Sequence, residues 1–223
     1  MHKKIINELR DKNLRHFACD NIPITKERLK DVQDELEKKF EDVLDCLLID
    51  WRRDPNSQGT PKRLAKMYLN EIFVGRYAKA PVVTAFPNEG ENAYTGMLVV
   101  KTEVRSLCAH HHQPVKGICY IGIIPNGKVI GLSKYSRLVD WVSRRGHLQE
   151  ELTNMIAKEI MKATGSEDVG VYMLLSHGCC ENRGIKTHDS RTQTTVLNGR
   201  FLTNTETKME YFDNIKIQEN ATR

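Results

Sequence analysis

The amino-acid sequence predicts an α+β fold, in which an antiparallel sheet carries a helix pair on one face and N-terminal helices precede the sheet. The main observation is the order of patterns along the chain. Helical periodicity over 133–144 and 147–163 is bracketed on both sides by segments that are typical of strands. Strands before and after a helix pair favour an antiparallel sheet with helices on one face. The length of 223 residues allows one well-cored domain with a small appendage.

The composition argues against a membrane protein and against a dedicated nucleic-acid binder. Hydrophobic residues make up 39% and charged residues 28% of the chain, and no apolar run is long enough to cross a bilayer. The net charge of +5 is mild and suits an anionic ligand. The first residues lack the apolar core of a signal peptide, so we expect a cytoplasmic protein without a nucleic-acid or membrane partner.

Two helices are predicted before the sheet. Residues 1–24 show no clean periodicity and are expected to be weakly ordered, with at most a short helix. From Thr25, which is the expected N-cap, apolar residues recur at spacings of three and four. Thr60 is the expected cap of the second helix, Pro61 occupies its first position, and Gly75 is expected to end it.

The strands are predicted from alternation and turn residues. The candidates are 96–105, 115–124, 127–132, 168–177 and 191–199. Between the second and the third, Pro125-Asn-Gly-Lys128 predicts a hairpin turn, so these two strands are expected to pair.

One stretch concentrates residues that bind metals. Cys108 and His111 are three positions apart, and His110 and His112 flank His111. Six cysteines in a chain without export signals indicate metal binding or catalysis where they cluster with histidine. A third ligand is expected at Cys179, which completes a Cys-His-Cys set that suits zinc and leaves a fourth position open for water.

Strand alternation orders the residues around Cys179. His177 is two positions before Cys179 and is expected on the same side of a strand, beside the metal and available for proton transfer. Cys180 is expected on the other side and is interpreted as a packing residue. Two alternatives stay open. The cysteines and histidines are unrelated surface and core residues, or a histidine serves as fourth ligand of a structural zinc site.

A basic segment predicts an anion pocket near the metal. Gly131–Arg137 runs from a strand into a helix, with Ser133 as expected N-cap and Lys134 and Arg137 in the first turns. Cations there are unfavourable unless an anion is present, and Arg183 adds a guanidinium suited to phosphate. The alternative is that Lys134 and Arg137 face solvent.

Four motifs together resemble the zinc-dependent GTP cyclohydrolase I family over about residues 58–200. They are Thr60-Pro-Lys-Arg-Leu-Ala-Lys-Met-Tyr68 with Glu71-Ile-Phe73 and Gly75; Cys108-x-His110-His111 with Pro114; Gly131-Leu-Ser-Lys134 with Arg137 and Gln149-Glu150; and His177-x-Cys179 with Arg183-Gly184. Their order and spacing agree with the family without large gaps.

The resemblance implies a fold, an assembly and a reaction. The fold would be the tunnelling fold, and the subunits would form a homodecamer with active sites at subunit interfaces. The reaction would convert GTP and water to 7,8-dihydroneopterin triphosphate and formate, with Zn²⁺ as cofactor. The implied segments are an N-terminal arm (1–24), an N-terminal helical region (25–75), a tunnelling-fold catalytic domain (76–204) and a polar C-terminal tail (205–223).

The resemblance also implies roles for individual residues. The implied metal ligands are Cys108, His111 and Cys179, and the implied catalytic residues are His110, His177, Ser133 and Gln149. The implied substrate-binding residues are Lys66, Ser133, Lys134, Arg137, Gln149, Glu150 and Arg183, with Lys66 supplied by a neighbouring subunit. Glu150 would hold the guanine edge, and the basic residues would hold the triphosphate and ribose.

The chain departs from the family pattern at four positions. Ala109 stands where the family usually has Glu, His112 replaces an apolar residue, and Cys180 and Glu181 are also unusual. Because none of these is a metal ligand, the departures bear on rate and substrate rather than on the metal. Two alternative functions stay open, a non-catalytic zinc- and GTP-binding homologue and a same-fold nitrile reductase acting on a 7-deazaguanine.

Overall fold

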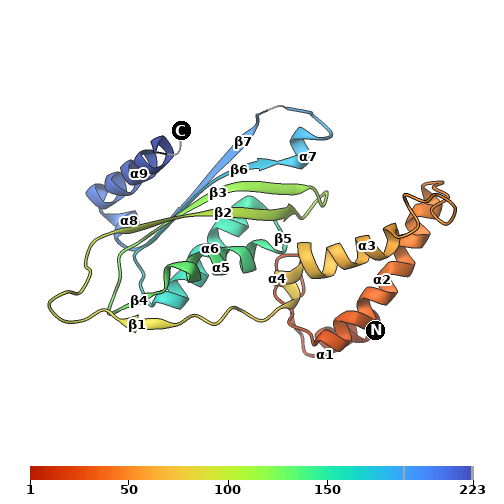
Figure 1. Cartoon of the computed structure of the whole chain (residues 1–223). Coiled ribbons are helices and arrows are strands. Elements are labelled where there is room, and N and C mark those ends of the chain that lie inside the picture. Colours follow the sequence, from red (N-terminus) through yellow and green to blue (C-terminus); the bar gives the residue numbers. More distant parts are fainter. Residues whose placement is uncertain (188, 222–223) are drawn as a thin grey trace. The chain divides into compact units, whose positions relative to one another are not determined.

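The computed structural model describes residues 1–187 and 189–221. The chain forms two compact units, Met1–Lys79 and Ala80–Arg223, and Figure 1 shows the elements of each. Within the described residues, no helix is both long enough and apolar enough to cross a membrane.

The first unit is helical. Its elements are α1 (His2–Asp11), α2 (Lys26–Cys46), α3 (Thr60–Met67), the π-helical turn η1 (Tyr68–Ile72) and α4 (Val74–Tyr77). The predicted N-cap Thr25 is confirmed, because its side chain accepts a hydrogen bond from the Arg28 amide at 3.3 Å. The expected ends of the next helix were wrong. Gly59 precedes α3 as its N-cap, and Gly75 is buried inside α4 instead of ending a helix.

Residues 12–24 are tied to the end of this unit rather than weakly ordered. The Arg76 guanidinium donates hydrogen bonds to the carbonyls of His16, Ala18 and Asp20 at 2.9–3.0 Å. The Asn21 side-chain amide donates to three carbonyls between residues 75 and 78. The Arg76 bonds pair backbone carbonyls of residues 16–20, and the Asn21 bonds pair backbone carbonyls of residues 75–78. Buried backbone carbonyls need such partners, so these bonds fix the segment in place. The expected short helix is present as α1.

The second unit contains the sheet. Its elements are β1 (Ala85–Pro87), β2 (Leu98–Cys108), β3 (Pro114–Ile123), β4 (Lys128–Ile130), α5 (Leu132–Ser143), β5 (Gly146–His147), α6 (Gln149–Thr164), β6 (Val169–His177), α7 (Gly178–Glu181), β7 (Arg191–Leu197), α8 (Arg200–Thr203) and α9 (Thr205–Asn220). The strand order is β5-β2-β3-β6-β7, and every pair is antiparallel except the short parallel pair of β2 and β5. The predicted α+β class with a mainly antiparallel sheet is confirmed.

The predicted hairpin between β3 and β4 was wrong. β3 pairs with β2 along one edge and with β6 along the other, so it has no free edge for a third strand. β4 instead pairs with β1, with Phe86 opposite Val129, in a separate two-stranded ribbon. The Pro-Asn-Gly segment bends the chain, but the occupied edges of β3 decide the pairing.

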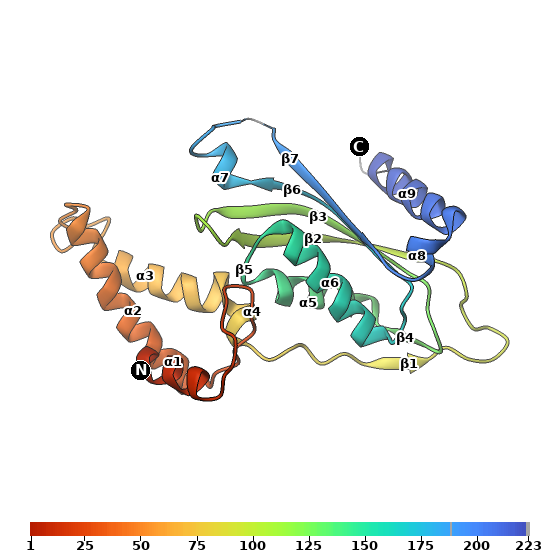
Figure 2. The same ribbon diagram turned by 180° about the vertical axis from the view of Figure 1, so that it is seen from behind.

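The main core lies between the sheet and the helix pair α5 and α6, which cover one face together (Figure 2). Ile121 on β3 and Met173 on β6 meet Val139 on α5 and Ile156 on α6, and all four side chains are at most 1% exposed. Burying a side chain of this kind stabilises the fold by about 1.5–3 kcal/mol. The predicted helix pair on one face of the sheet is confirmed.

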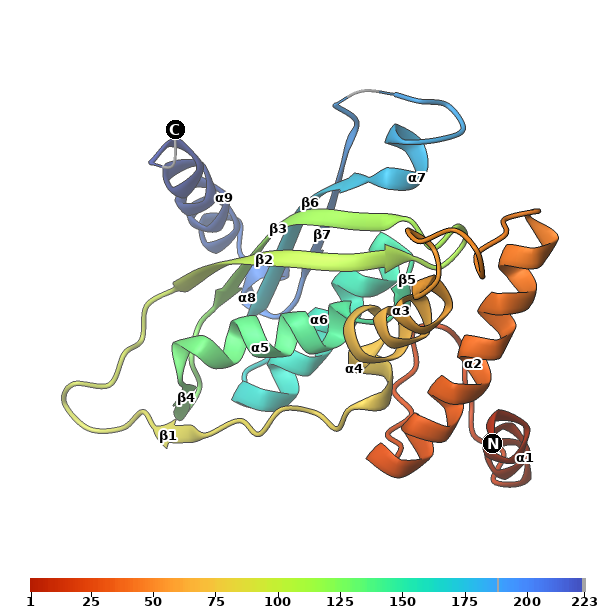
Figure 3. The ribbon, with the colours of Figure 1, turned by 45° about the vertical axis from the view of Figure 1, so that its right-hand side comes forward.

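On the sheet face opposite α5 and α6, the helices α8 and α9 cover part of the surface around Tyr120 (Figure 3). The C-terminal segment is therefore not simply a polar tail. Tyr211 of α9 is fully buried, and its hydroxyl donates to the Tyr120 carbonyl at 2.8 Å. Gly122 makes room for it, because a Cβ there would lie 2.6–2.7 Å from the rings of Tyr211 and Phe201.

We expect Tyr211→Ala to lower the free energy of unfolding by about 3–5 kcal/mol, as is typical of large aromatic truncations in a core. Tyr211→Phe, which removes the hydrogen bond from the hydroxyl to the Tyr120 carbonyl, should cost about 1 kcal/mol. Met209→Ala on the exposed side of α9 is the matched control. Urea unfolding monitored by circular dichroism measures all three. Equal midpoints for Tyr211→Ala and Met209→Ala would show that α9 does not stabilise the sheet.

Candidate active site

The β2–β3 turn is a compact loop that carries the histidines. The Cys108 amide donates to the Gln113 carbonyl at 2.9 Å, and the His112 amide donates to the Cys108 carbonyl at 3.0 Å. His112 adopts a positive φ of 51°, a left-handed conformation that His tolerates better than most residues. His112 therefore has a structural place in this turn, which its sequence position did not reveal.

A buried histidine supports Cys108 from the neighbouring strand. His147 on β5 lies opposite Cys108 in the parallel pair, and its carbonyl accepts the Ala109 amide at 3.2 Å. Its Nε2 lies 2.7 Å from the Val142 carbonyl, and since a carbonyl only accepts, Nε2 carries the proton. Burial lowers the pKa of His147 to about 4, so the ring stays neutral at neutral pH.

Cys179 reaches the same place from a helical turn. β6 ends at His177, and Cys179 and Cys180 belong to α7, so the expected strand alternation of these residues was wrong. Gly178 allows α7 to pack closely on the start of β3, because a Cβ there would lie 3.1 Å from the Pro114 carbonyl oxygen. This contact holds α7 beside the turn that follows Cys108.

Three side chains meet as a possible metal group. The sulfurs of Cys108 and Cys179 and a ring nitrogen of His111 all lie within 4.8 Å of one another. Cys108 is buried, Cys179 is half-buried and His111 is exposed. A set of two thiols and one imidazole fits zinc and similar borderline-soft ions, and it leaves room for a further, non-protein ligand.

The electrostatics of the thiols also favour a cation. Burial raises the pKa of Cys179 to about 11, and the neighbouring Cys108 and Cys180 thiols add to this effect. Two thiolates at this separation repel each other unless a cation lies between them, which lowers the pKa of its ligands instead. Cys180 lies outside the three-residue group, with its sulfur 4.0 Å from that of Cys179.

His177 is held by a side-chain amide. Its Nε2 lies 2.7 Å from Oε1 of Gln149, the first residue of α6. Burial lowers the pKa of His177, and the nearby carboxylates of Glu150 and Glu181 oppose that shift. His110 is exposed in the turn, with its ring centroid 6.2 Å from that of His111. The structure thus brings His110 next to a ligand and gives His177 a defined partner.

Ser133, Lys134 and Arg137 of the predicted anion pocket lie at the other end of α5, whereas Arg183 follows α7. Gly131 is the N-cap of this helix, so Ser133 is in its first turn and not at the expected cap. The Lys134 ammonium donates to the Val82 carbonyl at 3.0 Å, and Arg137 is exposed.

These residues do not meet the metal ligands within one chain. The far end of α5 leads into β5, which pairs with Cys108 (Figure 1). The ten steps along the helix from residue 133 to residue 143 span about 15 Å at ~1.5 Å per residue. An anion pocket beside the metal therefore stays a prediction, and it requires residues of more than one chain. Lys66 lies in α3 of the first unit, and its role stays a prediction.

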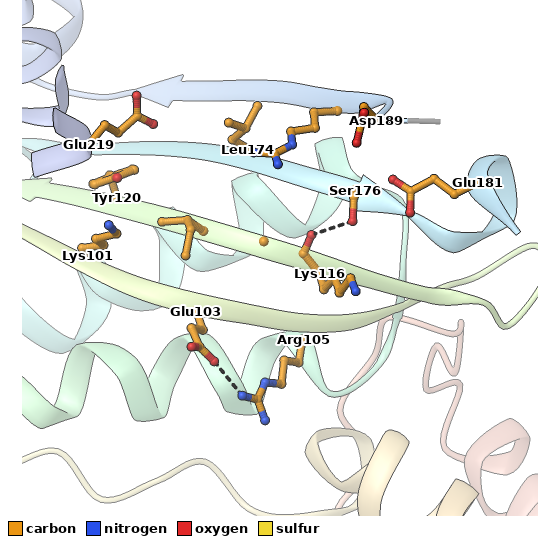
Figure 4. Close-up of a pocket in the computed structure, with 13 residues that line it drawn as sticks. Lys101, Glu103, Arg105, Lys116, Tyr120, Leu174, Ser176, Glu181, Asp189 and Glu219 are labelled. Carbon is orange, nitrogen blue, oxygen red and sulfur yellow. Dashed lines mark hydrogen bonds and ion pairs between the residues drawn. The ribbon is translucent and has the colours of Figure 1, made fainter. Parts of the chain in front are cut away.

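A groove of about 750 Å³ lies on the sheet face opposite α5 and α6 (Figure 4). Lys101, Glu103 and Arg105 of β2 line it, alternating with Val104, which points into the core. Glu103 and Arg105 form an ion pair at 2.7 Å. Cys108 faces the helix-covered core on the other side of the sheet, although Glu181 of α7 lines one end of the groove.

Comparison with known proteins identifies the family. The profile described as GTP cyclohydrolase I matches residues 36–216. The chain belongs to the GTP cyclohydrolase I family. Similar proteins named GTP cyclohydrolase 1 include one from Flavobacterium johnsoniae, 38% identical over 91% of this chain and 92% of its own length. Others come from Pseudoalteromonas translucida (35% identical, 83% of this chain, 100% of the relative) and Campylobacter jejuni (38% identical, 79% of this chain, 94% of the relative).

Among solved structures, the archaeosine synthase QueF-Like in the apo form aligns with 46% of this chain and 93% of its own. The TM-score is 0.38 and the sequence identity 19%. That likeness is too slight to carry an argument.

We expect the purified protein to bind about one divalent transition-metal ion per chain, as three-ligand sites do. Cys108→Ser and Cys179→Ser should each remove most of it, because each takes away one of three protein ligands. Cys180→Ser should retain the metal, and Cys46→Ser, at an exposed thiol, is the matched control. Elemental analysis after gel filtration gives the metal content. Metal loss in Cys180→Ser equal to that in Cys179→Ser would overturn the ligand assignment.

Proposed function

We propose that the protein converts GTP and water to 7,8-dihydroneopterin triphosphate and formate, the first step of pterin and folate, or of deazapurine, synthesis. The observation that carries this proposal is the meeting of Cys108, His111 and Cys179 within 4.8 Å in a chain of the GTP cyclohydrolase I family. These ligands come from two segments far apart in the sequence.

We assign Zn²⁺ as the cofactor and Cys108, His111 and Cys179 as the residues that hold it. Bound there, zinc supplies an acidic water, since it can lower the pKa of water to about 7. The donor set favours zinc over magnesium or calcium, which prefer oxygen ligands. The β2–β3 turn and α7 place these donors from opposite sides of the start of β3.

Proton transfers are assigned to two histidines. His177 is half-buried and held by Gln149, and it protonates the guanine ring nitrogen as the imidazole ring of GTP opens. His110 is exposed in the turn beside His111 and assists the later transfers, including sugar rearrangement and ring closure. A positioned general acid or base of this kind contributes about 10²–10⁴-fold to the rate.

The substrate contacts divide into two groups. Gln149 and Glu150 open α6 at the metal end of the sheet, where the exposed Glu150 carboxylate accepts the N–H groups of the guanine edge. The triphosphate and ribose are bound by Ser133, Lys134 and Arg137 at the start of α5, with Arg183 and with Lys66 of a neighbouring subunit. Binding of triphosphate at Lys134 exchanges its present bond to the Val82 carbonyl for a stronger, charge-assisted one.

A second copy of the chain completes the site in this proposal. The start of α5 and the metal ligands lie at opposite ends of the helix, so one chain does not present both to one GTP molecule. An assembly with sites between subunits, of the homodecameric tunnelling-fold kind, removes this difficulty. The cytoplasmic location expected from the sequence stays a prediction, as does the division of the chain into four functional segments.

Ala109 lies between Cys108 and the histidines, and its backbone is fixed by the bond to the His147 carbonyl. A methyl group there removes a hydrogen-bond acceptor that the family usually supplies, but it leaves the three metal donors in place. The substitution therefore bears on turnover and not on metal content.

We expect the zinc-loaded protein to release formate from GTP in equal amount to a product that becomes a fluorescent pterin after oxidation. Cys108→Ser should reduce formate release by at least about 10²-fold, because the activated water is lost. Formate assay and product mass spectrometry measure both. Tight GTP binding without formate would instead identify a non-catalytic homologue. Turnover of a 7-deazaguanine nitrile with NADPH, and not of GTP, would identify a reductase.

We expect complementation between two inactive variants. Co-expressed Cys108→Ser and Lys134→Ala chains, carrying different tags, should recover about a quarter of the wild-type activity if each site draws its two halves from different chains. The two proteins expressed separately and mixed without subunit exchange are the control. No recovery in tandem-purified mixed oligomers would show that one chain supplies both halves.

A further inference from the structure

A closed set of hydrogen bonds joins His177 to α6 and β7. The Gln149 amide nitrogen donates to the Thr192 carbonyl at 2.9 Å and to the Thr194 hydroxyl at 3.0 Å. The Thr153 hydroxyl donates to the Gln149 carbonyl at 2.8 Å and lies 2.7 Å from the Thr194 hydroxyl. Gln149 and Thr153 are buried, so these polar groups depend on one another.

The chemistry of the partners fixes the direction of the amide. A backbone carbonyl only accepts hydrogen bonds, so the Gln149 side-chain atom that faces Thr192 must be the nitrogen. The oxygen of the same amide therefore faces His177. An amide oxygen also only accepts, so the proton of this bond belongs to Nε2 of His177.

The hydroxyl groups reinforce this direction. Because the Thr153 hydroxyl donates to the Gln149 carbonyl, it accepts from the Thr194 hydroxyl. The Thr194 oxygen is then an acceptor for the Gln149 amide nitrogen. A flipped amide would place two acceptors opposite each other at Thr192 and break this set.

We propose that Thr153 and Thr194 are positioning residues that hold Gln149 so that His177 keeps its proton on Nε2. Nδ1 is then the ring nitrogen that is available to a substrate. Among the described residues, Nδ1 has no hydrogen-bond partner, whereas Nε2 is occupied by Gln149. The catalytic part of this inference rests on the proposed function, but the tautomer does not.

The positions of the two threonines in the fold explain how they can act on His177. Gln149 and Thr153 are one helical turn apart on α6, and Thr194 is on β7. β7 pairs with β6, the strand that ends at His177. The network therefore ties the orientation of the imidazole to the packing of α6 on the edge strand.

The tautomer is measured by magic-angle spinning ¹⁵N spectroscopy of the full-length, zinc-loaded protein labelled at histidine. His177→Asn identifies the signal of His177 among the eight histidines by subtraction. We expect wild-type His177 to show protonated Nε2 and, in the neutral ring, unprotonated Nδ1. A neutral ring with its proton on Nδ1 would overturn the proposal.

The variants separate positioning from folding. Thr194→Val should mix the two tautomers of neutral His177 and lower kcat for GTP by about 10-fold, less than the loss of a whole acid–base group, with KM within about 2-fold. Thr194→Ser keeps the hydroxyl and should restore both readouts. Thr195→Val, at the exposed neighbour on β7, should match the wild type.

Thr153→Val is a second, independent variant, and it should mix the tautomers in the same way. An unchanged His177 spectrum in folded Thr194→Val and Thr153→Val would overturn the proposal, whatever the activity. If the protein has no turnover of GTP but the tautomer is as stated and is lost in these variants, the proposed function fails and the positioning role stands.

Discussion

The register of β3 between β2 and β6 is the constraint on which the candidate site depends. Leu107 lies opposite Pro114 on one side, and His177 lies opposite Val115 on the other. Cys108 and α7 therefore flank the start of the same strand. A slip of one residue in either pair would turn every side chain of the strand to the other face and separate the donors. The buried residues of the helix-covered face make such a slip costly, so the core maintains the metal geometry at a distance.

Most elements were predictable from the sequence because their patterns are local. The periodicity of α5 and α6 and the alternation of β2, β3 and β6 follow from which residues are buried. The Cys and His residues of the metal group were predictable from composition, since packing alone does not require them. The C-terminal helix was missed because its buried face is narrow: within α9, Tyr211 and Ile215 are buried in a mostly polar segment.

The errors have a common cause, which is that local patterns do not report what is already paired elsewhere. The Pro-Asn-Gly turn predicted a hairpin, but β2 and β6 occupy both edges of β3. The spacing of His177 and Cys179 predicted strand alternation, but the chain turns into α7 at Gly178. The threonine network was not visible in the sequence, because Thr153 and Thr194 are ordinary residues for a helix and a strand.

The candidate site combines buried side chains that are held by hydrogen bonds with exposed histidines on a short turn. The buried ring of His147 is fixed by its bond to the Val142 carbonyl, and the buried amide of Gln149 fixes the direction of the His177 ring. His110 and His111 are exposed on a short turn, where they can reach a ligand. A hydrogen bond between buried groups is costly to leave unmade, so the buried groups have one arrangement and the exposed ones several. In the proposed positioning role, Thr153 on α6 and Thr194 on β7 act on His177 through Gln149, so that a helix and an edge strand set the orientation of a side chain near the start of β3.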